Sequence, residues 1–295
     1  MFDDRVCDSA HGRLQEVIAD QNGYFAAENL DYVIEGGENF GVKPGVRNER
    51  GELFSGAFES YLHGGGNKGD RSDVSCACHW AVNQAAVSSV GQMWGGAYVF
   101  SPAAIVVPED SPIRRPDDLK CQDIAVGYHS GSHFTTLQAL EPFLAKEDVR
   151  LRFVGSPWER VDAAVRKEVP ASSVWGITYL TSEQLELRKV LDCSFMMAFM
   201  FPHTADREDI RKYINGLRRA QMELDLFPEK YKPLYAQLIP ERYRDRVDTR
   251  LFSSGERIVF LPYSEETFRR TQSWIRERGL FNDVPACDYE SAVCS

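Results

Sequence analysis

Residues 123–144, DIAVGYHSGSHFTTLQALEPFL, constrain the fold of this chain more than any other stretch. They begin with a short apolar run typical of a strand, continue through a turn of Gly and Ser, and end in a segment expected to be helical. A strand that passes through such a turn into a helix is the unit from which parallel sheets are built. The stretch therefore predicts an α/β fold.

Other segments repeat this alternation along the chain. Strands are expected at residues 31–37, 98–110, 149–155, 171–176 and 187–201. Helices are expected at residues 11–30, 158–167, 207–231 and 264–280. Residues 39–70 are rich in Gly and charge, which indicates surface loops around a short helix near Phe58. A chain of 295 residues is long enough for two α/β lobes.

Charge and hydropathy exclude several classes of protein. The formal net charge is −10 and the basic residues are scattered, which argues against nucleic acid or an anionic membrane as a partner. No run approaches the ~18 apolar residues of a membrane helix, so membrane insertion is not expected. The first residues, MFDDRVCDSAHGRLQEV, carry aspartates where a signal peptide carries basic residues. We therefore expect a cytoplasmic protein, or a periplasmic or extracellular one if a leader has been removed.

The seven cysteines do not form the dense, even-numbered framework of a small disulfide-rich domain. Most are expected to be reduced thiols, several of them buried. Cys287 and Cys294 are close enough in sequence to pair as a local clip, and this alternative stays open.

Three stretches give the chain a resemblance to a known family. They are residues 8–35 (DSAHGRLQEVIADQNGYFAAENLDYVIE), residues 72–82 (SDVSCACHWAV) and residues 103–141, which contain IVVPEDSPIRRPDDL and IAVGYHSGSHFTTL. In order and pattern they resemble the type II periplasmic solute-binding proteins. The most similar branch contains sulfonate-binding and thiamine-precursor-binding proteins together with the fungal thiamine pyrimidine synthase.

The resemblance implies a two-lobed clamshell with two interlobe crossings. The first lobe would contain residues 1–102 and 201–295, and the second would contain residues 103–200. A ligand would lie in the interlobe cleft, at the carboxyl ends of strands, where helix N-termini offer N–H groups to an anion. Segments 7–11, 75–80 and 128–134 would all fall at such strand ends.

The sequence CACHW carries the densest group of reactive side chains. Cys76, Cys78 and His79 are candidate ligands for zinc or iron, although Cys-x-Cys-His is not the spacing of structural zinc sites. Three histidines from neighbouring loops would complete the metal shell: His11, His129 and His133. Alternatively, Cys76 or Cys78 is a nucleophile whose pKa is lowered by a helix N-terminus and by His79. In a third alternative one cysteine packs inward, while His79 and Trp80 form a wall that stacks on a ligand.

The sequence YHSGSHFTT places small and hydroxyl-bearing residues where a helix begins. These residues are Ser130, Gly131, Ser132 and Thr135. They suit a cradle for a carboxylate, sulfonate or phosphate, with Gly131 allowing close backbone approach. The alternative is an ordinary N-cap, for which Ser is a preferred residue. Because a cap does not require His129 and His133 on either side, we expect a ligand cradle.

Aromatic residues of the second lobe are candidates for the wall of the cleft. Trp175 and Phe195 are expected to line an apolar ligand pocket, and Trp158 is expected at its rim. The alternative is that they belong to the core, where such residues more often lie.

The expected function is binding of a small, anionic and partly aromatic molecule in the cleft. We expect a cytosolic enzyme of the lyase, decarboxylase or biosynthetic synthase type, with His79 and His133 as general acid and base and Cys76 or Cys78 as nucleophile or metal ligand. The catalytic residues of the fungal synthase are not carried over, because its cysteine-rich run is in the other lobe and no lysine accompanies His11 here. The alternative is a sensor or a non-catalytic substrate-binding protein, whose partner would be an ABC transporter if the chain is secreted.

Overall fold

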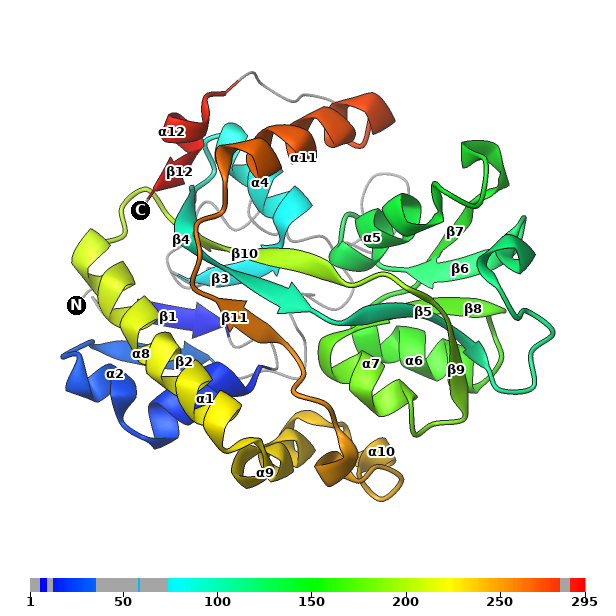
Figure 1. The fold of residues 1–295 in the computed structure, drawn as a ribbon, viewed down its shortest axis with the longest axis horizontal. Coiled ribbons are helices and arrows are strands. Elements are labelled where there is room, and N and C mark those ends of the chain that lie inside the picture. The colour runs from blue at the N-terminus through cyan, green and yellow to red at the C-terminus, as the bar shows by residue number, and fades with distance from the viewer. Residues whose placement is uncertain (1–5, 10–12, 36–57, 59–73, 282–286, 295) are drawn as a thin grey trace.

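The computed structural model describes residues 6–9, 13–35, 58, 74–281 and 287–294. Their strands form two five-stranded sheets, which lie side by side in Figure 1, and one two-stranded sheet. The first sheet contains β3, β4, β10, β11 and β12, and the second contains β5 to β9. The α/β architecture predicted from the sequence is confirmed.

The second sheet contains the βα unit predicted at residues 123–144. Its strands, in sheet order, are β7 (Arg150–Phe153), β6 (Asp123–Val126), β8 (Ala171–Trp175), β5 (Ala103–Pro108) and β9 (Leu187–Asp192). β6 pairs in parallel with β7 and β8, whereas β5 pairs antiparallel with β8 and β9. Each parallel strand is followed by a helix: α5 (Gly131–Leu140), α6 (Pro157–Val165) and α7 (Gly176–Ser182). The N-termini of these helices therefore lie at the carboxyl ends of the strands.

The first sheet is covered by helices on both faces. Its strands are β11 (Arg257–Val259), β4 (Gln92–Ser101), β10 (Phe195–Phe201) and β3 (Ser75–Cys78), with β12 (Val293–Cys294) beside β4. On one face Ala77, Ala198 and Met200 pack with α4 (His79–Val87), α11 (Glu265–Arg278) and α12 (Tyr289–Ala292). On the other face Cys76 and Phe199 pack with α1 (Leu14–Gln21) and α8 (Arg207–Leu226). The small parallel sheet of β1 (Val6–Ser9) and β2 (Tyr32–Glu35) lies beside α1, α2 (Tyr24–Ala27) and α8 (Figure 1).

The chain passes between the two large sheets where β4 continues into β5 and where β9 continues into β10. Residues 98–110, expected as a single strand, divide at Pro102, because proline lacks the N–H that a sheet ladder needs. Residues 187–201 divide in the same way at Cys193 and Ser194. The predicted helix at 11–30 ends at its expected stop, since Gly23 adopts a φ of +68° between α1 and α2.

A C-terminal segment of short helices reaches the second sheet. It contains α9 (Pro228–Tyr231), α10 (Glu241–Arg244) and 3₁₀ turns at Lys232–Leu238 and Thr249–Leu251; two more turns lie at Pro116–Leu119 and Lys146–Asp148. The helix expected at 207–231 divides before Pro228. Arg242 donates two hydrogen bonds, of 3.0 and 2.9 Å, to the Asp162 carboxylate on α6. This contact ties α10 to the helices of the second sheet.

Two expectations about cysteines and membranes can be compared with the structure. Cys287 and Cys294 do not form a disulfide, so the local clip is absent from the described part of the chain, and the Cys294 thiol lies 3.4 Å from the Met93 carbonyl oxygen. Within the described residues, none of the helices combines the length and the apolar character needed to cross a bilayer.

Candidate functional site

Ends of strands from the two large sheets meet at what we call the junction, defined by Cys78, Gly131, Gly176, Phe195 and Glu256. A Cβ atom added to Gly131, at the start of α5, would lie 2.6 Å from the Phe195 ring and 3.3 Å from Cβ of Cys78. A Cβ atom on Gly176, which follows β8, would lie 3.1 Å from Oε1 of Glu256. Glycine therefore leaves room for these side chains at both positions, whereas the expectation that Gly131 allows a ligand to approach the backbone stays a prediction.

The two cysteines of CACHW are buried on β3. Both pack into the same core, since residues two apart on a strand face the same side of a sheet. The expectation that only one of them packs inward is wrong. Burial raises the pKa of the Cys76 thiol to about 12, although nearby Arg13 acts in the opposite direction. Cys76 is therefore a protonated thiol at neutral pH, which does not favour the nucleophile hypothesis.

His79 begins α4 and points toward α11. Its Nδ1 lies 2.9 Å from the hydroxyl of Tyr263 and 3.2 Å from that of Thr271. Asn83 donates to the Tyr263 hydroxyl at 3.0 Å, which fixes this network. Burial lowers the pKa of His79 to about 3, so the imidazole is neutral.

The structure does not bring Cys76, Cys78 and His79 together as a metal site. Among the described residues, no group of three His, Cys, Asp or Glu side chains is placed to hold a metal ion. The physical reason is that the cysteines pack into the core beside α1, whereas the His79 ring lies against the hydroxyls of Tyr263 and of Thr271 on α11. His11, proposed to complete the shell, lies outside the described residues.

The hydroxyl groups of the expected cradle hold the turn before α5. Gly127 donates its N–H to Ser132 at 2.9 Å, and Ser130 donates to the Gly127 carbonyl at 2.8 Å. Thr135 donates to the carbonyl of Cys193 in the passage between the sheets. In the described part of the chain, no side chain caps the N-terminus of α5. These hydroxyls therefore stabilise the turn itself, and the ligand cradle stays a prediction.

The two histidines of this turn pack against one another. The His129 backbone N–H donates to Nδ1 of His133 at 3.2 Å, so neutral His133 carries its proton on Nε2. Burial and the neighbouring His129 lower the pKa of His133 to about 3. His129 itself has a φ of +43°, an unusual value for a residue other than glycine, at the start of the turn.

Aromatic side chains from both sheets surround Phe195. The ring of Trp80, at the start of α4, lies 5.9 Å from that of Phe195, and Trp175, at the end of β8, lies 6.2 Å from it. The indole N–H groups of Trp80 and Trp175 are buried and find no hydrogen-bond partner in the described structure. Trp158 does not join them, because its ring stacks on Tyr243 at 6.1 Å beneath α10.

Sequence reasoning missed a buried charged cluster next to the junction. Arg13 forms an ion pair with Glu16 on the first turn of α1, and both side chains are almost fully buried. Tyr213 of α8 donates to the same carboxylate at 3.2 Å. Glu256 accepts a hydrogen bond of 2.6 Å from Ser101, and burial raises its pKa to about 7. Charged residues are surface residues by default, so the sequence carried no signal for this cluster.

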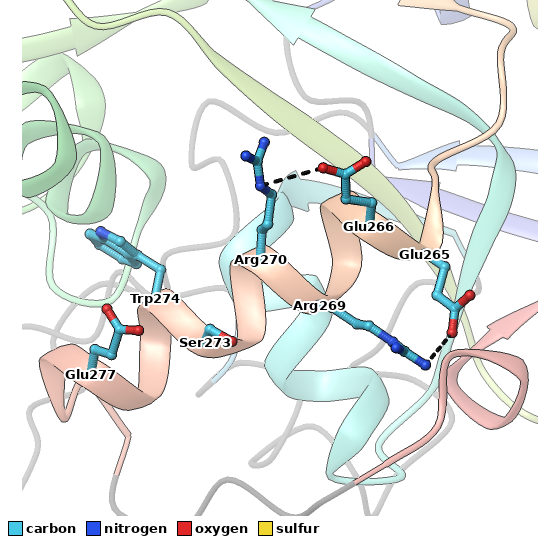
Figure 2. A pocket seen from close by; sticks show the side chains of 7 residues that line it. All are labelled: Glu265, Glu266, Arg269, Arg270, Ser273, Trp274 and Glu277. Atoms are coloured by element: carbon cyan, nitrogen blue, oxygen red, sulfur yellow. Dashed lines mark ion pairs between the residues drawn. The ribbon is translucent and has the colours of Figure 1, made fainter.

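An open groove follows one face of α11 (Figure 2). Its lining residues are Glu265, Glu266, Arg269, Arg270, Ser273, Trp274 and Glu277. Arg269 pairs with Glu265 at 2.6 Å and Arg270 with Glu266 at 3.6 Å, so the charges of this surface neutralise each other along one helix. The indole of Trp274 donates to Glu141 at the end of α5 at 2.8 Å, which links α11 to the second sheet.

Comparisons with known proteins place the fold. No family model matches the chain, and no curated protein sequence matches it. Among solved structures, the alkanesulfonate-binding protein SsuA from Xanthomonas axonopodis pv. citri, bound to MOPS, has a TM-score of 0.71 at 16% identity, with 100% of this chain and 99% of that chain covered. The Candida albicans CA3427 gene product, described as having the generic periplasmic binding protein fold, has a TM-score of 0.64 at 15% identity, over 98% and 94% of the two chains.

The desulfurization enzyme DszB is also similar, with a TM-score of 0.62 at 12% identity over 98% of this chain and 96% of that chain. The expected type II periplasmic-binding-protein fold is therefore confirmed. Because binding proteins and an enzyme share this fold, the fold does not decide the function.

Proposed function

We propose that the protein binds a small organic anion with an aromatic part at the junction, and that it is primarily a binding protein. The observation that carries this proposal is the pair of buried, unpartnered indole N–H groups of Trp80 and Trp175, which flank Phe195 from the two sheets. Buried donors without acceptors are costly, and a ligand with acceptor oxygens would satisfy them. The rings would pack on the apolar part of the same ligand.

The backbone of α5 supports an anionic ligand. A helix N-terminus carries N–H groups and the positive end of the helix dipole, and the first turn of α5 lies within contact distance of Phe195. A similar fold holds MOPS in an alkanesulfonate-binding protein, which favours a sulfonate or carboxylate ligand here. The resemblance to the thiamine-related branch stays a prediction. It is tested by adding a hydroxymethyl-pyrimidine to the ligands whose binding is measured. An ABC transporter would be the partner if the chain is exported, whereas the cytoplasmic expectation is tested by cell fractionation.

The binding proposal is tested by calorimetry with benzenesulfonate, benzoate and neutral benzyl alcohol. Sulfonate buffers are avoided because they would compete. In the variant Gly131→Val, the new side chain would collide with the Phe195 ring, and we expect affinity for the aromatic anions to fall at least tenfold. Gln138→Val, on the exposed face of the same helix, is the matched control and should bind normally. Equal binding by both variants, or no binding of any anion by the wild type, would reject the proposal.

Catalysis is the second candidate, and Glu256 is the observation that favours it. A carboxyl group with a pKa of about 7 can both accept and donate a proton at neutral pH. The test incubates each bound ligand with the wild type and with Glu256→Gln, then compares the ligand's mass spectrum before and after. A mass change that only the wild type produces would support an enzyme, whereas an unchanged ligand would leave a binding protein.

A further inference from the structure

We propose that Arg13 binds the anionic group of the ligand, a sulfonate or carboxylate, and that Glu256 takes up a proton as the anion binds. This inference rests on the proposed function and deepens it, because it assigns the ligand's charged group to the Arg13, Glu16 and Glu256 cluster.

Arg13 has hydrogen-bonding capacity that the folded chain does not use. The residue is 2% exposed, and its Nε and Nη2 donate to the Glu16 carboxylate. Its Nη1 is buried and has no hydrogen-bond partner within the described residues. An unsatisfied N–H on a buried cation is among the more costly defects of a protein interior. An oxyanion is the acceptor that suits a guanidinium N–H best.

The surroundings of Arg13 suit a ligand with both a charge and an aromatic part. The guanidinium carbon lies 5.3 Å from the centroid of the Phe199 ring on β10. Arg13 is also close enough to Glu256 to oppose the rise of its pKa. Glu256 in turn faces Gly176, the residue that follows Trp175. The cluster therefore adjoins the aromatic group around Phe195.

The charges of the cluster explain why Glu256 would take up a proton when an anion binds. The charged and titratable groups near Glu256 are Arg13, which precedes α1, Glu16 of α1, Cys76 of β3 and Tyr235 of the 3₁₀ turn at Lys232–Leu238. Arg13 is the single cation of this group, and Glu16 already neutralises it. A bound anion would raise the cost of ionising Glu256, which is close to half protonated at neutral pH. Protonation of Glu256 removes one negative charge from the cluster, so anion binding and proton uptake favour each other.

The test uses benzenesulfonate and its neutral isostere benzenesulfonamide, titrated by calorimetry at pH 7 in Tris and in imidazole. These buffers differ in ionisation enthalpy, so a difference in heat reports protons taken up. We expect the wild type to prefer benzenesulfonate at least tenfold and to take up about half a proton with it. The double variant Arg13→Met/Glu16→Gln removes the ion pair as a unit, so that no buried charge is left alone, and should lose most of this preference. Arg13→Lys, which keeps the charge, should retain part of it.

The outcomes separate this inference from the binding proposal. If benzenesulfonamide still binds and Gly131→Val still weakens it, but the double variant keeps the preference for the sulfonate, the role of Arg13 is rejected while binding at the junction stands. Equal heats in the two buffers for the wild type would reject proton uptake. For Glu256→Gln, which lacks the carboxyl group, we expect equal heats. If neither probe binds the wild type, both proposals fall. Circular dichroism and thermal unfolding of each variant show whether it is folded.

Discussion

At the scale of single residues, burial controls the protonation of the reactive groups near the junction. Cys76 has Arg13 beside it, yet the loss of water outweighs this charge and keeps the pKa of the thiol high. The pKa of His79 and that of His133 are lowered for the same reason. Sequence reasoning selected these side chains by their chemistry, but it could not weigh burial. Burial depends on α1, α8 and α11, which cover the strands from distant parts of the chain.

The state of Cys76 leads to a prediction about thiol reactivity. With a pKa of about 12, only about one thiol in ten thousand is ionised at pH 8, and the thiolate is the reactive form. Cys121 is exposed and serves as the internal control. We expect iodoacetamide to modify Cys76 at least a hundredfold more slowly than Cys121 in the folded protein, as measured by peptide mass spectrometry. Comparable rates in folded protein would show that Cys76 is accessible and ionised, and would restore the nucleophile hypothesis.

At the scale of elements, α11 and α5 connect the two large sheets through Glu141. This carboxylate accepts hydrogen bonds of 2.8 Å from the indole of Trp274 and from Nε of Arg278. Because both partners are on α11 and Glu141 follows the last residue of α5, the contact ties the C-terminal end of α5 to α11. These side chains are partly exposed, so water and salt reduce the contribution of the contact to the free energy of unfolding.

The variant Glu141→Ala tests this connection. We expect the free energy of unfolding to fall by about 1 kcal/mol and the release of a junction ligand to become several times faster. Urea unfolding and stopped-flow tryptophan fluorescence provide the two measurements. Glu147→Ala removes an exposed carboxylate from the neighbouring 3₁₀ turn and should change neither. Faster release in both variants would point to the net charge of this surface and not to the contact with α11.

The elements show why the sequence predicted the fold better than the site. The βα unit at residues 123–144 was correct because its strand, turn and helix are local signals. The signal at Gly23 was also local, and α1 and α2 separate there. The site, in contrast, depends on which strand ends face each other across the junction. The contact of Gly131 with Phe195 and that of Gly176 with Glu256 join residues more than sixty positions apart, and no local pattern encodes such contacts.

At the scale of the whole molecule, the buried titratable groups make stability depend on pH in opposite directions. His79 and His133 have folded pKa values of about 3 against 6.5 for an ordinary histidine, so only the unfolded chain binds their protons between these values. The contribution of these two histidines to the free energy of unfolding is fully present above pH 6.5 and is lost as the pH falls below that value. Glu256 has a folded pKa of about 7 against 4.5, so it binds its proton preferentially in the folded state and opposes the loss.

We therefore expect urea unfolding to show a net loss of stability as the pH falls from 6.5 to 4.5. Each histidine would contribute a loss of up to about 3 kcal/mol and Glu256 a gain of similar size, which leaves a net loss of about 3 kcal/mol. Glu256→Gln removes the opposing group, so its loss over the same range should be nearly twice as large. His79→Gln should flatten the dependence, whereas His203→Gln, at an exposed histidine, should leave it unchanged. A stability that stays constant or rises toward pH 4.5 would mean that the two imidazoles are hydrated in solution.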